Sequence, residues 1–92
     1  MKIEESFILR EIAGDYVVVP TGKAAMRFNG LITINGTGAY LWEQLSEERT
    51  IEELAKSVCQ EYEVDEESAR RDTEEFVELL RRYEILENNL DG

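Results

Sequence analysis

The spacing of apolar residues changes near Asn35, and this change limits the folds that the chain can adopt. Before it, residues 7–12 and 16–19 form short β-branched and aromatic runs typical of strands. After it, apolar residues recur at the three- and four-residue intervals of amphipathic helices. The sequence therefore predicts an α+β protein in which a small three-stranded antiparallel sheet precedes three helices.

The first two strands are predicted to form a hairpin. Residues 13–15 separate the two apolar runs, and Gly14 can supply the positive φ of a tight reversal. Pro20 lacks an amide hydrogen and Gly22 breaks the pattern, so the second strand is expected to end there. Residues 21–27 are then expected to be a mobile connection.

A third short strand is expected after a turn at Asn29 and Gly30. Three short strands cannot build a sizeable open sheet, and one of them must be an edge with unpaired backbone donors and acceptors. The third strand is expected to be short. Its residues are Leu31, Ile32, Thr33 and Ile34.

Two helices are expected to follow the third strand. The first is predicted to be capped by Asn35 or Thr37 and to bury Trp42, which lies at helical spacing between other apolar residues. The second begins with a capping box, in which Thr50 and Glu53 each accept a hydrogen bond from an otherwise unpaired amide.

The last helix is predicted to begin at an Asp65 cap, and its inward residues are Ala69, Thr73, Phe76, Val77, Leu80 and Tyr83. At 100° per residue, Arg70, Val77 and Arg81 share one flank beside this apolar stripe. Such a flank could bind the carboxylate and apolar side chains of a peptide. The alternative is that both arginines pair with neighbouring glutamates of the same helix.

Length and charge narrow the possible functions. The 92 residues are expected to form one domain over 1–92, with its core at about 7–86, and the net charge is −11. Residues 1–46 carry 4 basic and 5 acidic side chains, whereas residues 47–92 carry 6 and 16. Because such a surface repels phosphate, nucleic acid and anionic membranes are not expected as partners.

Few residues are suited to catalysis or metal binding. The chain has no histidine and one cysteine, so it lacks a disulfide pair, a His-based zinc set and a Ser-His or Cys-His couple. Cys59 lies in an apolar helical stripe and is interpreted as a core residue. There is no signal-peptide core and no long apolar run, so we expect a cytoplasmic protein. Because the ligands of common metal sites are missing, we expect a protein that needs no cofactor.

One stretch of the sequence resembles a known family. Asn35, Thr37, Gly38, Ala39 and Trp42 match the Asn-x-Thr-Gly-Ala-x-x-Trp signature of the PqqD-like family. Further along the chain, the matches to the family's last helix are Ala69, Asp72, Phe76 and Leu80. The similarity extends from about Phe7 to Leu86. This family includes the peptide chaperone of pyrroloquinoline quinone biosynthesis and the recognition elements for precursors of ribosomally synthesised, modified peptides.

The resemblance implies a small winged helix-turn-helix fold and a non-catalytic function. Members of the family bind the leader segment of a ribosomally made precursor peptide, which adds as a strand to the third strand and lies against the last helix. They present it to a modifying enzyme, often a radical S-adenosylmethionine (SAM) enzyme. Arg70 and Arg81 enter from helix geometry and not from the family. The expected peptide-binding residues are Leu31, Ile32, Thr33, Ile34, Arg70, Thr73, Val77 and Arg81.

Two other classes of function are alternatives to peptide recognition. A winged helix can bind nucleic acid or serve as a general protein-interaction module. For nucleic acid, however, the second helix offers only Lys56 against four glutamates. A small enzyme or metal-binding subunit is disfavoured because histidine is missing.

Overall fold

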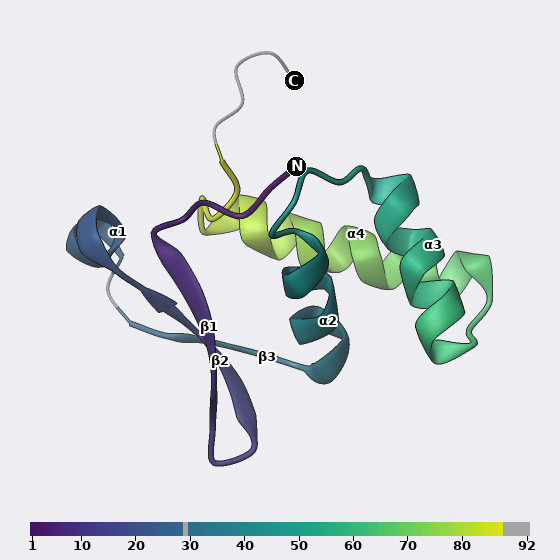
Figure 1. Ribbon diagram of the computed structural model, residues 1–92, viewed down its shortest axis with the longest axis horizontal. Coiled ribbons are helices and arrows are strands. Elements are labelled where there is room, and N and C mark those ends of the chain that lie inside the picture. The colour runs from purple at the N-terminus through teal and green to yellow at the C-terminus, as the bar shows by residue number, and fades with distance from the viewer. Residues whose placement is uncertain (29, 88–92) are drawn as a thin grey trace.

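The computed structural model describes residues 1–28 and 30–87, and within them it confirms the α+β class. The strands β1 (Phe7–Ile12), β2 (Asp15–Pro20) and β3 (Ile32–Ile34) form one antiparallel sheet in the order β1-β2-β3. The helices are α1 (Gly22–Arg27), α2 (Gly36–Gln44), α3 (Ile51–Tyr62) and α4 (Glu66–Arg82). Figure 1 shows the sheet on one side and helices α2, α3 and α4 on the other.

The predicted hairpin is present, and its turn has two residues. Ala13 and Gly14 have φ values of 52° and 86°, the positive values that a tight reversal between twisted strands requires. The predicted third strand begins one residue later than expected. Leu31 lies outside the ladder and is 63% exposed, whereas Ile32 pairs with Val18.

The prediction of a mobile connection over residues 21–27 was wrong, because α1 occupies this segment. The backbone amide and hydroxyl of Thr21 both donate to the Ser6 carbonyl, at 2.6 and 2.9 Å. Ala24 is fully buried, so it anchors the helix to the core. The turn predicted at Asn29 and Gly30 lies partly outside the described residues, because Asn29 is not among them. Gly30 has a positive φ of 124°.

The predicted caps of the last three helices are confirmed. Asn35, not Thr37, caps α2, and its side chain accepts a hydrogen bond from the Gly38 amide at 2.7 Å. The capping box of α3 is complete. Asp65 caps α4 by accepting from the Ser68 amide. Each cap satisfies an amide that the helix itself leaves unpaired, which explains why these helices begin where they do.

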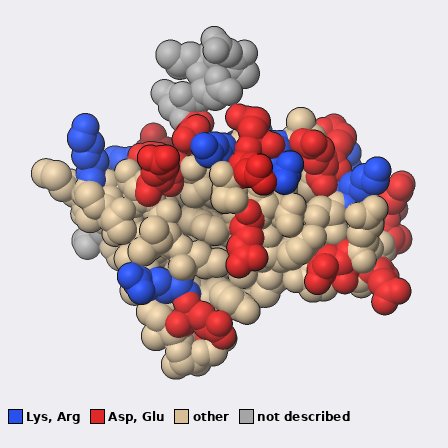
Figure 2. Space-filling model, in the orientation of Figure 1, with Lys and Arg blue, Asp and Glu red and all other residues tan. Residues whose placement is uncertain are grey.

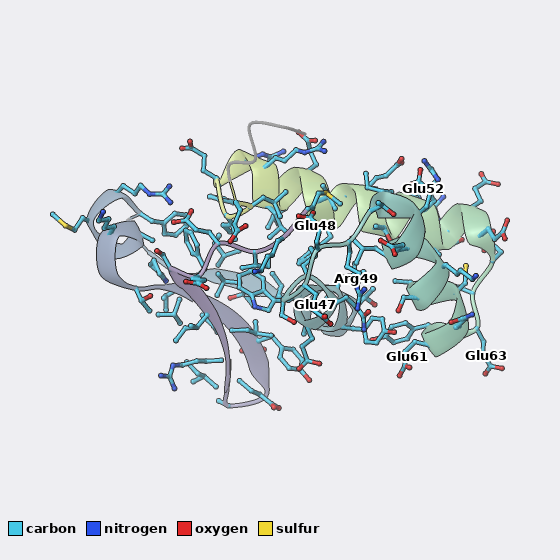
Figure 3. All side chains as sticks on the ribbon, turned by 45° about the horizontal axis from the view of Figure 1, so that its top comes forward. Glu47, Glu48, Arg49, Glu52, Glu61 and Glu63 are labelled. Atoms are coloured by element: carbon cyan, nitrogen blue, oxygen red, sulfur yellow. The ribbon has the colours of Figure 1, made fainter. Side chains whose placement is uncertain are left out.

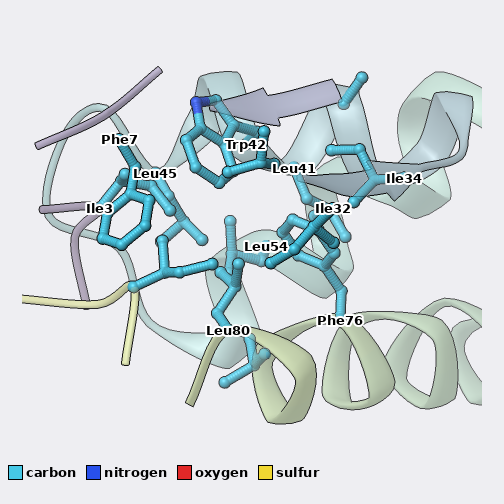
Figure 4. Packing of buried hydrophobic residues seen from close by; sticks show 14 of the residues in the cluster. Ile3, Phe7, Ile32, Ile34, Leu41, Trp42, Leu45, Leu54, Phe76 and Leu80 are labelled. Carbon is cyan, nitrogen blue, oxygen red and sulfur yellow. The ribbon is translucent and has the colours of Figure 1, made fainter. Parts of the chain in front are cut away.

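One buried cluster joins the sheet to the helices (Figure 4). Trp42 is 7% exposed and belongs to this cluster, as the helical spacing predicted. Val18 and Ile34 come from the sheet, and α3 and α4 contribute Leu54 and Leu80. Tyr83 is the exception among the predicted inward residues, because it lies partly exposed at the end of α4.

The first and last described segments lie side by side. Ile3 forms an antiparallel bridge with Leu86, and the Ile3 amide also donates to the Leu45 carbonyl at 2.9 Å. Both segments are thereby fixed at the C-terminal end of α2. In the described part of the chain, every helix is too short or too polar to cross a bilayer.

Candidate functional site

An open hollow of about 300 Å³ lies between β3 and α4, and we call it the β3–α4 groove. It also takes in the start of α2. Its lining residues are Thr33, Ile34, Asn35, Thr37, Gly38, Leu41, Asp72, Glu75, Phe76 and Leu79. One strand and two helices therefore build the groove, from segments that are far apart in the sequence.

The strand wall of the groove is an unpaired sheet edge. Within residues 1–28 and 30–87, β3 pairs only with β2, through Tyr16–Ile34, Val17–Thr33 and Val18–Ile32. Along an antiparallel strand, consecutive residues direct their N–H and C=O groups alternately toward one neighbour and then the other. Part of the β3 backbone is consequently free to hydrogen-bond to a further strand on its open side.

The helix wall has an apolar base and an acidic rim. Asp72, Phe76 and Leu79 follow helical spacing along α4, and Glu75 lies on the same side. Phe76 is buried and Leu79 is half-buried, whereas Asp72 and Glu75 are exposed. The wall thus presents both apolar surface and carboxylates to whatever occupies the groove.

Gly38 allows α2 to pack closely at the base of the groove. A Cβ atom built on Gly38 would lie 3.2 Å from Phe76 Cε1 and 3.3 Å from Ile34 Cβ. Such distances are tighter than ordinary van der Waals contact, so a side chain here would force its neighbours to move. The glycine of the signature therefore determines how closely β3, α2 and α4 approach one another.

The structure distributes the predicted strand residues between the groove and the core. Thr33 is exposed and lines the groove together with Ile34. Ile32 and most of Ile34 are buried in the core cluster. Leu31 is exposed immediately before β3. The predicted edge is present, with Thr33 as its outward side chain.

The predicted residues of the last helix do not line the groove. Thr73 and Val77 are 0% and 1% exposed, so their side chains belong to the core and cannot contact a bound peptide without rearrangement. The Thr73 hydroxyl has no hydrogen-bond partner in the part of the chain that the structure describes. Helical spacing predicted their inward position correctly, but their assignment to the peptide site does not fit this burial.

The two predicted arginines lie away from the groove. Arg70 pairs with Glu74 at 3.3 Å and with Glu52 of α3 at 3.7 Å, and it borders a separate hollow between α3 and α4. Glu52 projects from the first turn of α3 (Figure 3). Arg81 lies 4.0 Å from Glu78. The alternative of pairing with glutamates therefore describes both side chains.

Sequence reasoning missed the residues that do form the helix wall. Asp72 and Phe76 match the family's last helix, and their separation of four residues, extended by Leu79, places all three on one side of that helix. This spacing does not show that the side faces β3.

The arrangement is suited to holding an extended chain. Among the described residues, no group of three His, Cys, Asp or Glu side chains could hold a metal ion. Acidic side chains gather over the helical part of the surface (Figure 2). The groove itself combines free backbone groups with apolar side chains, and these are the two features by which a strand can be added to a sheet.

Fold and groove together define a class of small α+β domain in which a short edge strand runs beside a helix. Within this class, the chain belongs to the PqqD family: the family model for coenzyme PQQ synthesis protein D matches residues 15–86. The resemblance inferred from the sequence is thereby confirmed.

A solved structure gives a second comparison. The structure described as TbiB1 in complex with the TbiA(beta) leader peptide is similar to this chain with a TM-score of 0.74 and 26% identity. The similarity covers 97% of this chain and 98% of that one. No curated protein matches the chain significantly.

Proposed function

We propose that this protein is a non-catalytic module that binds the leader segment of a ribosomally made precursor peptide in the β3–α4 groove. The observation that carries the proposal is the open β3 edge beside the apolar wall of α4. The structural similarity to TbiB1, which was solved with a leader peptide, supports it. So does membership of the PqqD family.

Strand addition explains how so small a site could bind a peptide. Backbone hydrogen bonds to β3 provide affinity with little dependence on sequence. Side chains of the added strand alternate in direction, so every second one points toward the groove. Phe76 and Leu79 would contact these residues, and they supply the apolar surface that a polar edge alone lacks.

The module would deliver the bound peptide to a modifying enzyme. A radical SAM enzyme is the partner class that the family resemblance implies. The chain would then contribute recognition, whereas the enzyme contributes the chemistry. Cytoplasmic location is part of the same proposal, since precursor peptides are made on ribosomes.

The test uses leader-length synthetic peptides copied from the short open reading frames beside the gene. Each peptide is titrated into the protein by calorimetry, and binders are mapped by backbone amide shifts. We expect the shifts to concentrate on residues 32–34 and on the side of α4 that carries Phe76 and Leu79. Shifts confined to α3 would contradict groove binding.

A second measurement examines strand addition without altering the protein. Each backbone amide of a binding peptide is methylated in turn, which removes one donor at a time. If the peptide adds to β3, methylation at alternate positions should abolish binding, because alternate residues face the strand. Uniform tolerance of methylation would contradict strand addition even if the peptide binds.

A further inference from the structure

The acidic residues on the two sides of α4 differ in their partners. On the side away from the groove, Glu74 pairs with Arg70 and Glu78 with Arg81. On the groove side, Asp72 and Glu75 form no ion pair with any residue in the described part of the chain. Among the described residues, these two carboxylates are also the only charged groups that line the groove.

The arginines nearest in sequence to Asp72 and Glu75 do not pair with them. Arg71 is four residues before Glu75 on α4, but its guanidinium lies 3.5 Å from the Ser68 hydroxyl, and no lysine or arginine of residues 1–28 and 30–87 lines the groove. The start of α2 also lines the groove, but its Gly38 amide donates to the Asn35 side chain, and the partial positive charge of a helix end is smaller than that of a cation. Residues three apart on a helix are neighbours, so the two like charges repel each other weakly. A cation placed between them would remove this repulsion.

We propose that the β3–α4 groove selects a peptide that carries a lysine or arginine side chain beside an apolar one. The apolar side chain packs on Phe76 and Leu79, and the cation lies at the Asp72 and Glu75 carboxylates. This inference rests on the proposed function and specifies the chemistry of the ligand. It also reverses the preference for an acidic peptide that Arg70 and Arg81 suggested.

The net charge of the whole protein also favours a basic peptide. The net charge of −11 attracts a basic segment and repels an acidic one before contact. Specificity then comes from the rim, because Asp or Glu in the bound segment would meet two uncompensated carboxylates. The same carboxylates would reject phosphorylated peptides.

The experiment selects binders from a displayed random-peptide library and compares three proteins. These are the wild type, the D72N/E75Q variant and the E74Q/E78Q variant, which loses the same charge from the opposite side of α4. For wild type and control, we expect enriched peptides to share one Lys or Arg position next to an apolar residue. For D72N/E75Q, we expect that position to lose its preference.

Affinity gives a second, quantitative comparison. A synthetic peptide from the wild-type selection should bind D72N/E75Q about tenfold more weakly, as expected for the loss of charge-assisted contacts, and E74Q/E78Q almost normally. High salt should narrow this difference, since it screens exposed charges. Circular dichroism confirms that both variants are folded.

The possible results distinguish a failure of this inference from a failure of the proposed function on which it rests. Groove-binding peptides without a basic position, or equal binding to D72N/E75Q and wild type, would overturn the charge preference and leave peptide recognition intact. Equal weakening in both double variants would assign the effect to overall charge and would also overturn it. If no selected peptide shifts the β3 amides, the proposed function itself fails, and this inference fails with it.

Discussion

The sheet has two edges, and the shorter one is the candidate site. β1 offers six residues, the last three of which are exposed, whereas β3 offers only three. The groove takes no residue from β1. In Figure 1 the far end of the β1–β2 hairpin extends away from the helices. The edge that carries the candidate site is therefore the one beside which a helix supplies a wall, and strand length is secondary.

The two edges can be compared at matched positions. Arg10 of β1 and Thr33 of β3 both pair with Val17, from opposite sides of the central strand. Arg10 and Glu11 also place charges on the β1 edge, a common protection against unwanted strand pairing. Val17 directs its N–H and C=O groups to only one of its two neighbours, Arg10 and Thr33. In a two-residue hairpin closed by Ile12 and Asp15 that neighbour is Arg10, so Thr33 and Glu11 present their N–H groups to the two open sides.

The largest expected effect is on the stability of the core that packs beneath the sheet. Trp42→Ala should reduce the free energy of unfolding by about 3 to 5 kcal/mol, because it removes a buried aromatic side chain from the shared cluster. Chemical denaturation followed by far-ultraviolet circular dichroism measures the loss. A change below about 1 kcal/mol would show that Trp42 contributes little to the core.

The next effect distinguishes the edges directly. Thr33→Pro should weaken peptide binding about a hundredfold, because proline removes the Thr33 N–H and its ring disturbs the neighbouring backbone hydrogen bond. Glu11→Pro should leave binding almost unchanged, because β1 is not part of the groove. Calorimetric titration of a binding peptide gives both affinities, and circular dichroism identifies a variant that has lost its sheet. If both folded variants lost the same affinity, the claim that peptide binds at β3 and not at β1 would be wrong.

A smaller effect should come from the close packing at the base of the groove. Gly38→Ala should cost about 1 kcal/mol or more of stability, because its Cβ would press on Phe76 and Ile34. It should also weaken peptide binding by displacing the wall. Gly36→Ala is the matched control in the same helix, since open space surrounds that position. Thermal unfolding of both variants measures the difference, and similar melting temperatures would show that the base can relax.

The smallest effect is a pH dependence at the helix starts, away from both edges. The hydrogen bond that the Thr50 amide donates to the carboxylate lowers the pKa of Glu53, and hydrogen bonds from Ser68 lower the pKa of Asp65. A lowered pKa in the folded state means that the stabilisation is present above the ordinary values of 4.5 and 3.8 and disappears as the pH falls through the folded-state pKa values.

Acidification should therefore destabilise the wild type slightly more than the Glu53→Gln and Asp65→Asn variants. Both variants remove the titrating carboxyl group and keep a side-chain oxygen that can accept a hydrogen bond. Melting temperatures at neutral and acidic pH give the comparison. An identical acid response in all three proteins would show that these caps contribute nothing to it.

Local signals in the sequence predicted much of the fold. The Ala13–Gly14 turn and the caps at Thr50 and Asp65 depend on residues close together in the chain, so their geometry follows from local chemistry. The helix α1 was missed because its strongest anchor is not local: Ala24 is buried by distant residues, and Thr21 binds Ser6 across the chain. Pro20 and Gly22 indicated only the end of the second strand.

The site was harder to predict than the fold. Periodicity identified the apolar stripe of α4, but the stripe has two polar borders that are equivalent in the sequence alone. Arg70 and Arg81 lie on one border and Asp72 on the other. The packing of α3 and β3 decides which border faces the groove, and no spacing within α4 contains that information.

The paired end segments bear on how this domain can be attached to other polypeptides. The Glu4 amide donates to the Ile85 carbonyl at 2.8 Å, and the Glu87 amide donates to the Lys2 carbonyl at 2.8 Å. These segments meet the C-terminal end of α2, whereas the groove lies at its N-terminal end, about 13 Å away along a nine-residue helix. A linker fused at either end would leave from one place and spare the groove, so a tethered enzyme would encounter captured peptide at a high effective concentration.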